Sequence, residues 1–127
     1  MQKGAEKRDS LGFKKGFIAL IFILEVILVF TFFDYLAHGI SPSYSVPAQY
    51  FINEIIYGTI IGFITYLFVR KQPILKKSLI LSAAVSILLQ TRYYLQNYSP
   101  SFVLMFMAIH FAILFIVSYL GIKLVKM

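Results

Sequence analysis

Four long apolar runs, separated by short polar segments, fill almost all of this chain. These runs extend over approximately residues 13–37, 48–69, 74–96 and 101–122. Each run reaches the ~20 residues with which an α-helix crosses about 30 Å of hydrocarbon. We therefore predict an all-α integral membrane protein, with a polar cytoplasmic tail over residues 1–12 and one domain of four transmembrane helices over residues 13–127.

The connections between the predicted helices are short, and each contains residues that end helices. Gly39, Pro42 and Pro47 lie between the first and second runs, and Pro73 and Pro100 precede the third and fourth. Proline cannot donate the backbone hydrogen bond that a helix interior requires. Because the last two connections are only a few residues long, consecutive helices must be antiparallel neighbours, which predicts an up-and-down four-helix bundle.

The basic residues are distributed asymmetrically between the two ends of the predicted bundle. Except for Arg92, every Lys and Arg lies in the N-terminal segment up to Lys15, in the 70–77 turn or within residues 123–127. The connections at 38–47 and 97–100 carry neither residue type. Since cytoplasmic segments are enriched in Lys and Arg, we expect both termini in the cytoplasm and the protein in the cell membrane.

Composition excludes several classes of protein. The chain is 60% hydrophobic and only 13% charged, so the lipid bilayer is its expected surrounding. The net charge of +7 lies mostly beside the helix ends, where it sets orientation and attracts anionic lipid rather than nucleic acid. The chain contains no cysteine, which excludes disulfides, thiolate metal sites and cysteine nucleophiles. Any metal ion would therefore be held by His and carboxylate side chains.

Small and polar side chains recur at four-residue spacing in the second and third runs. These stripes consist of Glu54, Gly58 and Gly62 in one helix, and of Ser78, Ser82, Ser86 and Gln90 in the other. In lipid, small residues at this spacing mark helix contacts, because apolar residues gain little by leaving the lipid tails. We expect both stripes to face the bundle interior or a contact between copies of the chain.

Ionisable side chains from different runs are predicted to converge in the outer half of the membrane, with His110 nearer its middle. Asp34 and His38 are one helical turn apart, and Glu54 and His110 offer further oxygen and nitrogen ligands. Such a set suits a divalent ion, for example zinc, copper(II) or iron. From a rise of ~1.5 Å per residue, His38 and His110 differ in depth by about 15 Å, which argues against a haem held by both.

A structural alternative assigns no ligand to these side chains. In this alternative, Arg92 pairs with Asp34 or Glu54, or reaches the lipid headgroups, and His110 bonds a backbone carbonyl. Gln90 and Arg92 then belong to the buried polar residues of the outer third. Tyrosines near the outer helix ends also predict an aromatic belt at that interface; they are Tyr35, Tyr44, Tyr50, Tyr93, Tyr94 and Tyr98.

Glu25 stands apart from the other polar residues. It lies nine residues before Asp34, about 180° around the same helix, so the two carboxylates cannot both face the bundle axis. A charged carboxylate near the middle of the bilayer costs about 3 kcal/mol. We therefore expect Glu25 to be buried as a protonated or paired group, or to be covered by another protein.

The sequence leaves three functional hypotheses open. The first is a structural or accessory subunit of a larger membrane complex, in contact with other membrane subunits or with copies of itself. The second is a homo-oligomeric cation or proton channel or carrier that uses Asp34 and Glu54. The third is a metal site in a redox or hydrolytic membrane complex. The sequence contains no nucleophile elbow, phosphate-binding loop or paired-His zinc motif, so we expect no catalytic activity of the chain alone.

Overall fold

The computed structural model describes the backbone of residues 2–126 and the side chains of residues 12–126. This part of the chain is helical throughout and contains no strand; its elements are α1 (Gln2–His38), the short 3-10 helix η1 (Pro42–Tyr44), α2 (Ala48–Val69), α3 (Ile74–Leu95) and α4 (Pro100–Val125). Each α-helix contains a stretch long and apolar enough to span a membrane. The prediction of an all-α chain with four helices long and apolar enough to span a membrane is confirmed.

The helix ends follow the local sequence. Pro47 and Pro73 occupy the N-cap positions of α2 and α3 without a side-chain hydrogen bond, whereas Ser99 caps α4 by accepting a hydrogen bond from the amide of Phe102. Asn97 adopts a left-handed backbone with φ of 71° and turns the chain between α3 and α4. The backbone of α1 continues as helix back to Gln2, so it includes the polar segment that precedes the apolar span.

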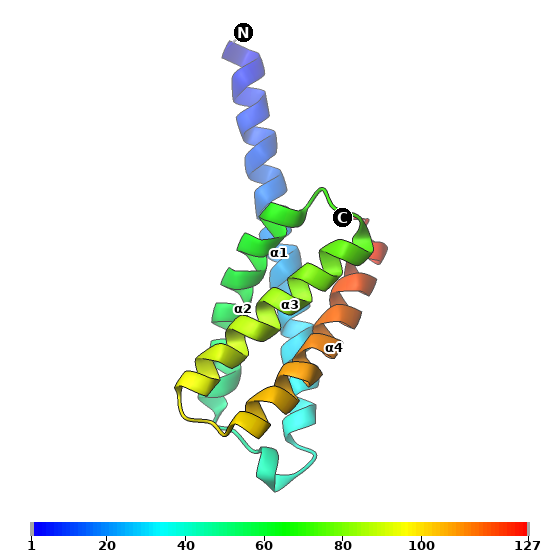
Figure 1. The fold of residues 1–127 in the computed structure, drawn as a ribbon. Coiled ribbons are helices and arrows are strands. Elements are labelled where there is room, and N and C mark those ends of the chain that lie inside the picture. The colour runs from blue at the N-terminus through cyan, green and yellow to red at the C-terminus, as the bar shows by residue number, and fades with distance from the viewer. Residues whose placement is uncertain (1, 127) are drawn as a thin grey trace.

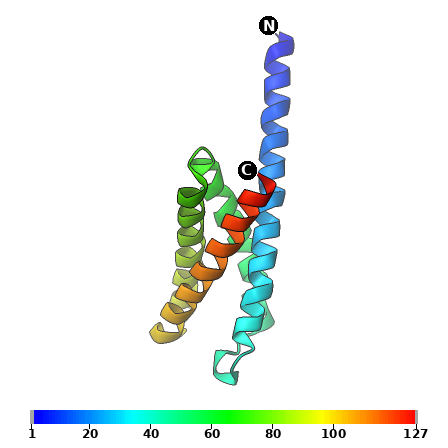
Figure 2. The same ribbon diagram turned by 90° about the vertical axis from the view of Figure 1, so that its right-hand side faces the viewer.

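The helices pack in a ring in which α1 and α3 each contact both α2 and α4. The two termini and the α2–α3 connection lie at one end of the molecule, and η1 and the α3–α4 connection lie at the other (Figure 1). The N-terminal part of α1 projects beyond the ends of the other helices (Figure 2). We call the end that holds η1 the outer end, following the charge distribution, and the opposite end the inner end.

The glycine stripe of α2 lies against α1. A Cβ built on Gly58 would lie 3.3 Å from the side chain of Ile27, and one on Gly62 would lie 3.0 Å from Cγ2 of Ile23. Both isoleucines are buried. These glycines therefore allow a close approach of α1 and α2 inside the bundle, and they do not form an outer face available to a second copy.

The serine stripe of α3 is also internal, as expected. Ser78, Ser82 and Ser86 are almost completely buried, and each hydroxyl donates to the carbonyl four residues earlier in α3. Each hydroxyl therefore finds its acceptor inside its own helix and places little volume between α3 and its neighbours.

Candidate functional site

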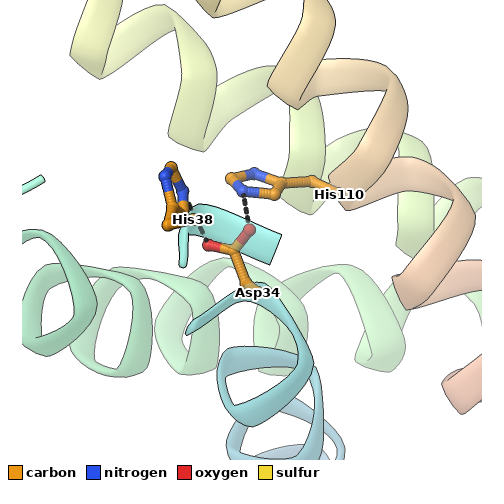
Figure 3. Close-up of side chains that lie close together, drawn as sticks. All are labelled: Asp34, His38 and His110. Carbon is orange, nitrogen blue, oxygen red and sulfur yellow. Dashed lines mark hydrogen bonds and ion pairs between the residues drawn. The ribbon is translucent and has the colours of Figure 1, made fainter. Parts of the chain in front are cut away.

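The four predicted ligand residues meet in the outer half of the bundle. Asp34 and His38 come from α1, Glu54 from α2 and His110 from α4, and all four are buried. Nε2 of His110 lies 2.8 Å from Oδ1 of Asp34 and 3.2 Å from Oε1 of Glu54, and Nε2 of His38 lies 3.4 Å from Oδ2 of Asp34. The Asp34 carboxylate thus lies between two imidazole rings (Figure 3).

The two histidines are much closer than the sequence predicted. Their ring centroids are 6.4 Å apart, so the expected difference in depth of about 15 Å is wrong. Helical side chains lean toward the N-terminus of their helix, which moves His38 inward on α1 and His110 outward on α4. In addition, α4 is inclined to α1 (Figure 2), so residues counted along α4 overestimate depth.

Aromatic neighbours fix the orientation of both imidazoles. The ring of Phe106 stacks on His38 with a centroid distance of 3.9 Å and an interplanar angle of 2°, and Phe30 meets His110 edge-on at 5.1 Å. These contacts direct both Nε2 atoms at the Asp34 carboxylate, whose oxygens lie 2.8 Å and 3.4 Å from them. The carboxylate therefore occupies the space where a haem bound by both histidines would lie, and the arrangement favours a small ion over a macrocycle.

The hydrogen bonds of His38 define its tautomer. Nδ1 lies 2.7 Å from the carbonyl oxygen of Tyr44, and a carbonyl only accepts, so Nδ1 must carry the ring proton and donate it. In the neutral ring, Nε2 then carries a lone pair. That lone pair faces Oδ2 of Asp34, which is also an acceptor. A proton or a cation between the two atoms would satisfy both.

His110 has the opposite arrangement. The amide nitrogen of Gln90 donates to Nδ1 of His110 over 2.8 Å, so the ring proton of the neutral imidazole lies on Nε2 and is donated to Oδ1 of Asp34. Glu54 approaches the same nitrogen. Two carboxylates therefore compete for one N–H group.

Several buried atoms of the site have no hydrogen-bond partner among the described residues. They are Oδ2 of Asp34, Nε2 of His38, both carboxylate oxygens of Glu54 and Oε1 of Gln90. An unsatisfied buried polar group costs about 1–3 kcal/mol, and more when it is charged. The cluster therefore contains more acceptors than donors, which is the condition that a bound cation or additional protons would relieve.

A cavity at the outer end reaches the site at His38. It has a volume of about 360 Å³ and is lined by Tyr35, Leu36, His38, Gly39, Ser45, Val46 and Phe51. On the inner side, the cluster is followed by buried apolar side chains, including Ile23, Val85 and Leu114. An ion can therefore approach His38 from the outer end. A second cavity, of about 870 Å³, opens at the inner end beside Lys15, Tyr66 and Arg70, and the buried apolar side chains lie between it and the cluster.

Two residues of the site were assigned elsewhere by sequence reasoning. Tyr50 and Tyr93 were expected in the aromatic belt, but they are only 2% and 1% exposed. Their rings stack at 4.1 Å, and the Tyr93 hydroxyl donates to the Tyr50 carbonyl. The spacing contained the signal, because Tyr50 extends the Glu54–Gly58 stripe of α2 by one turn. Tyr35 and Tyr94 are exposed, as a belt requires.

Two further polar residues lie outside the cluster. Arg92 is half-buried, and its guanidinium lies 4.1 Å from the ring centroid of Tyr57 rather than against Asp34. The structural alternative that pairs Arg92 with a carboxylate is therefore wrong, as is its assignment of His110 to a backbone carbonyl. Glu25 is exposed on the outside of the bundle, so the expectation that it is buried within this chain is wrong.

Comparison with known proteins finds no protein family, curated protein or solved structure that matches this chain. The fold and the site together define an all-α protein with four helices able to span a membrane and with a buried His–carboxylate cluster.

Proposed function

We propose that the protein crosses the cell membrane as an up-and-down four-helix bundle with both termini in the cytoplasm. The asymmetry of the basic residues supports this orientation. It directs the cavity beside His38 away from the cytoplasm.

We propose further that the bundle binds one divalent transition-metal ion at Asp34, His38 and His110, with Glu54 as a fourth ligand. The observation that carries this proposal is that one ligand atom from each of the first three residues lies within 4.8 Å of the others, with all three side chains buried. The unpartnered Nε2 of His38 and Oδ2 of Asp34 face the same point. A cation at that point would replace the missing donors.

The donor set determines the class of metal. Two imidazoles and one or two carboxylates suit zinc, iron(II), manganese or copper(II) better than soft copper(I). A tetrahedral zinc site with bonds of about 2.1 Å separates its ligand atoms by about 3.4 Å. Because the three ligand atoms already lie within 4.8 Å, side-chain movements of about an ångström complete the coordination sphere. The proposed role is that of a metal-binding component of a redox or hydrolytic membrane complex.

Metal analysis of the purified protein tests this role. The protein is extracted in mild detergent, treated with a chelator, dialysed separately against Zn²⁺, Fe²⁺, Mn²⁺ and Cu²⁺, and measured by plasma mass spectrometry. We expect about one ion per chain for at least one of these metals, and less than a tenth of this amount in Asp34→Asn and His38→Gln.

Two matched variants control for the loss of a charge. Glu25→Gln removes a carboxylate from the same helix, and Arg92→Gln removes the nearest basic side chain; both should retain the metal. A wild-type protein that is helical by circular dichroism but binds none of the four ions would contradict the proposal.

A cation or proton path through Asp34 and Glu54 is less well supported. The outer cavity provides an approach to His38, but the apolar side chains between the cluster and the inner end favour a site that ends within the membrane.

A role as a subunit of a larger membrane complex is a second candidate, and it is compatible with metal binding. The exposure of Glu25 on the outside of the bundle favours it, because a carboxylate facing lipid is costly unless another chain covers it. Native mass spectrometry of protein extracted from its own membrane tests this role. Co-migrating chains of different mass are expected, and a homogeneous species containing only this chain would contradict it.

A further inference from the structure

The outward face of α1 has the pattern of a helix that packs against another helix. Its exposed residues include a heptad series with alternating spacings of three and four residues, and these are Ile18, Ile21, Glu25, Leu28, Phe32 and Tyr35. The flanking positions are also exposed and apolar; they are Phe17, Leu24, Val29 and Leu36. We call this face the α1 seam. Transmembrane helices commonly pack along such seams with left-handed crossing.

Glu25 is the only acidic residue of the α1 seam, and the seam contains no Lys, Arg or His. It lies ten residues from Lys15 and thirteen from His38, which corresponds to about 15 Å and 20 Å along the helix. Lipid would solvate every other seam residue, but it cannot solvate a carboxylate at this depth. The carboxylate of Glu25 therefore needs a partner from a neighbouring helix that packs against the α1 seam.

The chain has no suitable partner of its own for Glu25 among the described residues. Lys14 and Lys15 lie near the inner end of the span, Arg70 and Lys71 lie in the inner connection, and Arg92 lies one turn from the outer end of α3. A second copy in the same orientation would place another Glu25 opposite the first. Charge complementarity therefore points to a different chain.

Given the subunit role proposed above, we infer that the α1 seam binds a single transmembrane helix of another protein, and that this helix carries a Lys or Arg opposite Glu25. The helix lies parallel or antiparallel to α1 and contacts the apolar seam residues on both sides of the ion pair. An acidic residue at a central seam position also sets the register, because sliding by one heptad would leave both charges in lipid.

A designed helix tests the inference on the full chain. The probe is a leucine-rich transmembrane peptide of about 23 residues with one central lysine, labelled for energy transfer and reconstituted with the labelled protein in phosphatidylcholine vesicles. We expect the lysine probe to associate at least about tenfold more strongly than the same peptide with leucine at that position, the magnitude of interhelical polar pairs in model peptides. Moving the lysine by seven residues should remove the preference.

Charge reversal provides the matched variant. The Glu25→Lys protein should lose the preference for the lysine probe and gain a preference for a glutamate probe. The Glu25→Leu protein should prefer neither of these probes. Far-ultraviolet circular dichroism should show the same helix content in all variants, since Glu25 lies outside the packed interior.

Equal binding of the lysine and leucine probes would overturn the inference. So would association of wild-type chains with one another that Glu25→Leu abolishes, because a second copy would then be the occupant of the seam. The subunit role is judged separately by the native mass spectrum. Co-migrating chains together with equal probe binding would reject the α1 seam as the contact and retain the subunit role.

Discussion

At the scale of single residues, Gln90 decides what His110 can bind. Its amide nitrogen contacts Nδ1 of His110, and its buried Oε1 has no partner among the described residues. If the amide turns by 180°, Oε1 accepts a proton from Nδ1 and the lone pair of Nε2 becomes available to a metal. Gln90 can therefore stabilise the imidazole both with a proton on Nε2 and with Nε2 bound to an ion.

Substitution of Gln90 tests this dual role. Gln90→Leu should lower the affinity for Zn²⁺ by about 10–100-fold, the usual loss when the outer partner of a ligating imidazole is removed. Gln90→Glu should retain the affinity, because a carboxylate also accepts from Nδ1–H. Affinity is measured by competition with a chromogenic chelator. Thr91→Leu, at the exposed neighbouring position, is the control, and unchanged affinity in Gln90→Leu would exclude Nε2 of His110 as a ligand.

At the scale of the helices, the contact between α1 and α2 determines whether the site can form, because α1 contributes Asp34 and His38 and α2 contributes Glu54. The two helices approach closely at Gly62, where a Cβ would lie 3.0 Å from Cγ2 of Ile23. Larger side chains at this position must move α1 or change the rotamer of Ile23.

Gly62→Val should therefore lower the stability of the bundle by about 1–3 kcal/mol, which appears as a lower midpoint of thermal unfolding in detergent. The double variant Gly62→Val with Ile23→Ala should recover part of this loss, because the added methyl groups then occupy the vacated volume. Gly16 has no neighbouring atom within 4 Å of a built Cβ, so Gly16→Val is the control and should not lower the midpoint. If the loss of stability in the double variant equals the sum of the losses in the two single variants, a direct contact between residues 62 and 23 is contradicted.

At the scale of the whole molecule, the site and the outer cavity lie toward one end of the bundle, and most of the basic residues lie toward the other. The cavity beside His38 opens at the end opposite the termini, while the basic inner end carries Arg70 and Lys71. With the proposed orientation, the cavity beside the proposed metal site opens to the non-cytoplasmic side, and buried apolar side chains lie between that site and the inner end.

Single cysteines test the orientation directly, because the natural chain contains none. Ser43 and Gln72 are both exposed and lie in connections at opposite ends of the bundle. In intact cells, a membrane-impermeant maleimide should label Ser43→Cys, and it should label Gln72→Cys only after permeabilisation. The reverse pattern would place the termini outside and would direct the cavity toward the cytoplasm.

The sequence by itself determined the four helices and most of their ends. A segment that spans a membrane must satisfy its backbone hydrogen bonds internally, which favours a helix. The length and hydropathy of each span, and the Pro or Gly residues that end it, are local properties of the sequence. It also identified the four side chains of the site and the internal stripes of α2 and α3, since four-residue spacing defines a helix face. The start of the first apolar span was predicted near residue 13 and lies at Gly12. The continuation of α1 back to Gln2 did not follow from the sequence, since a polar N-terminal segment carries no apolar pattern.

Only the tertiary structure decided how the site side chains meet. The inclination of α4 and the opposed lean of side chains on α1 and α4 bring His38 and His110 within 6.4 Å, and neither follows from counting residues along a span. The burial of Tyr50 and Tyr93, and the position of Arg92 over Tyr57, likewise depend on which helices are neighbours. Helix periodicity defines a face, but relative tilt and rotation, set by packing, decide which atoms touch.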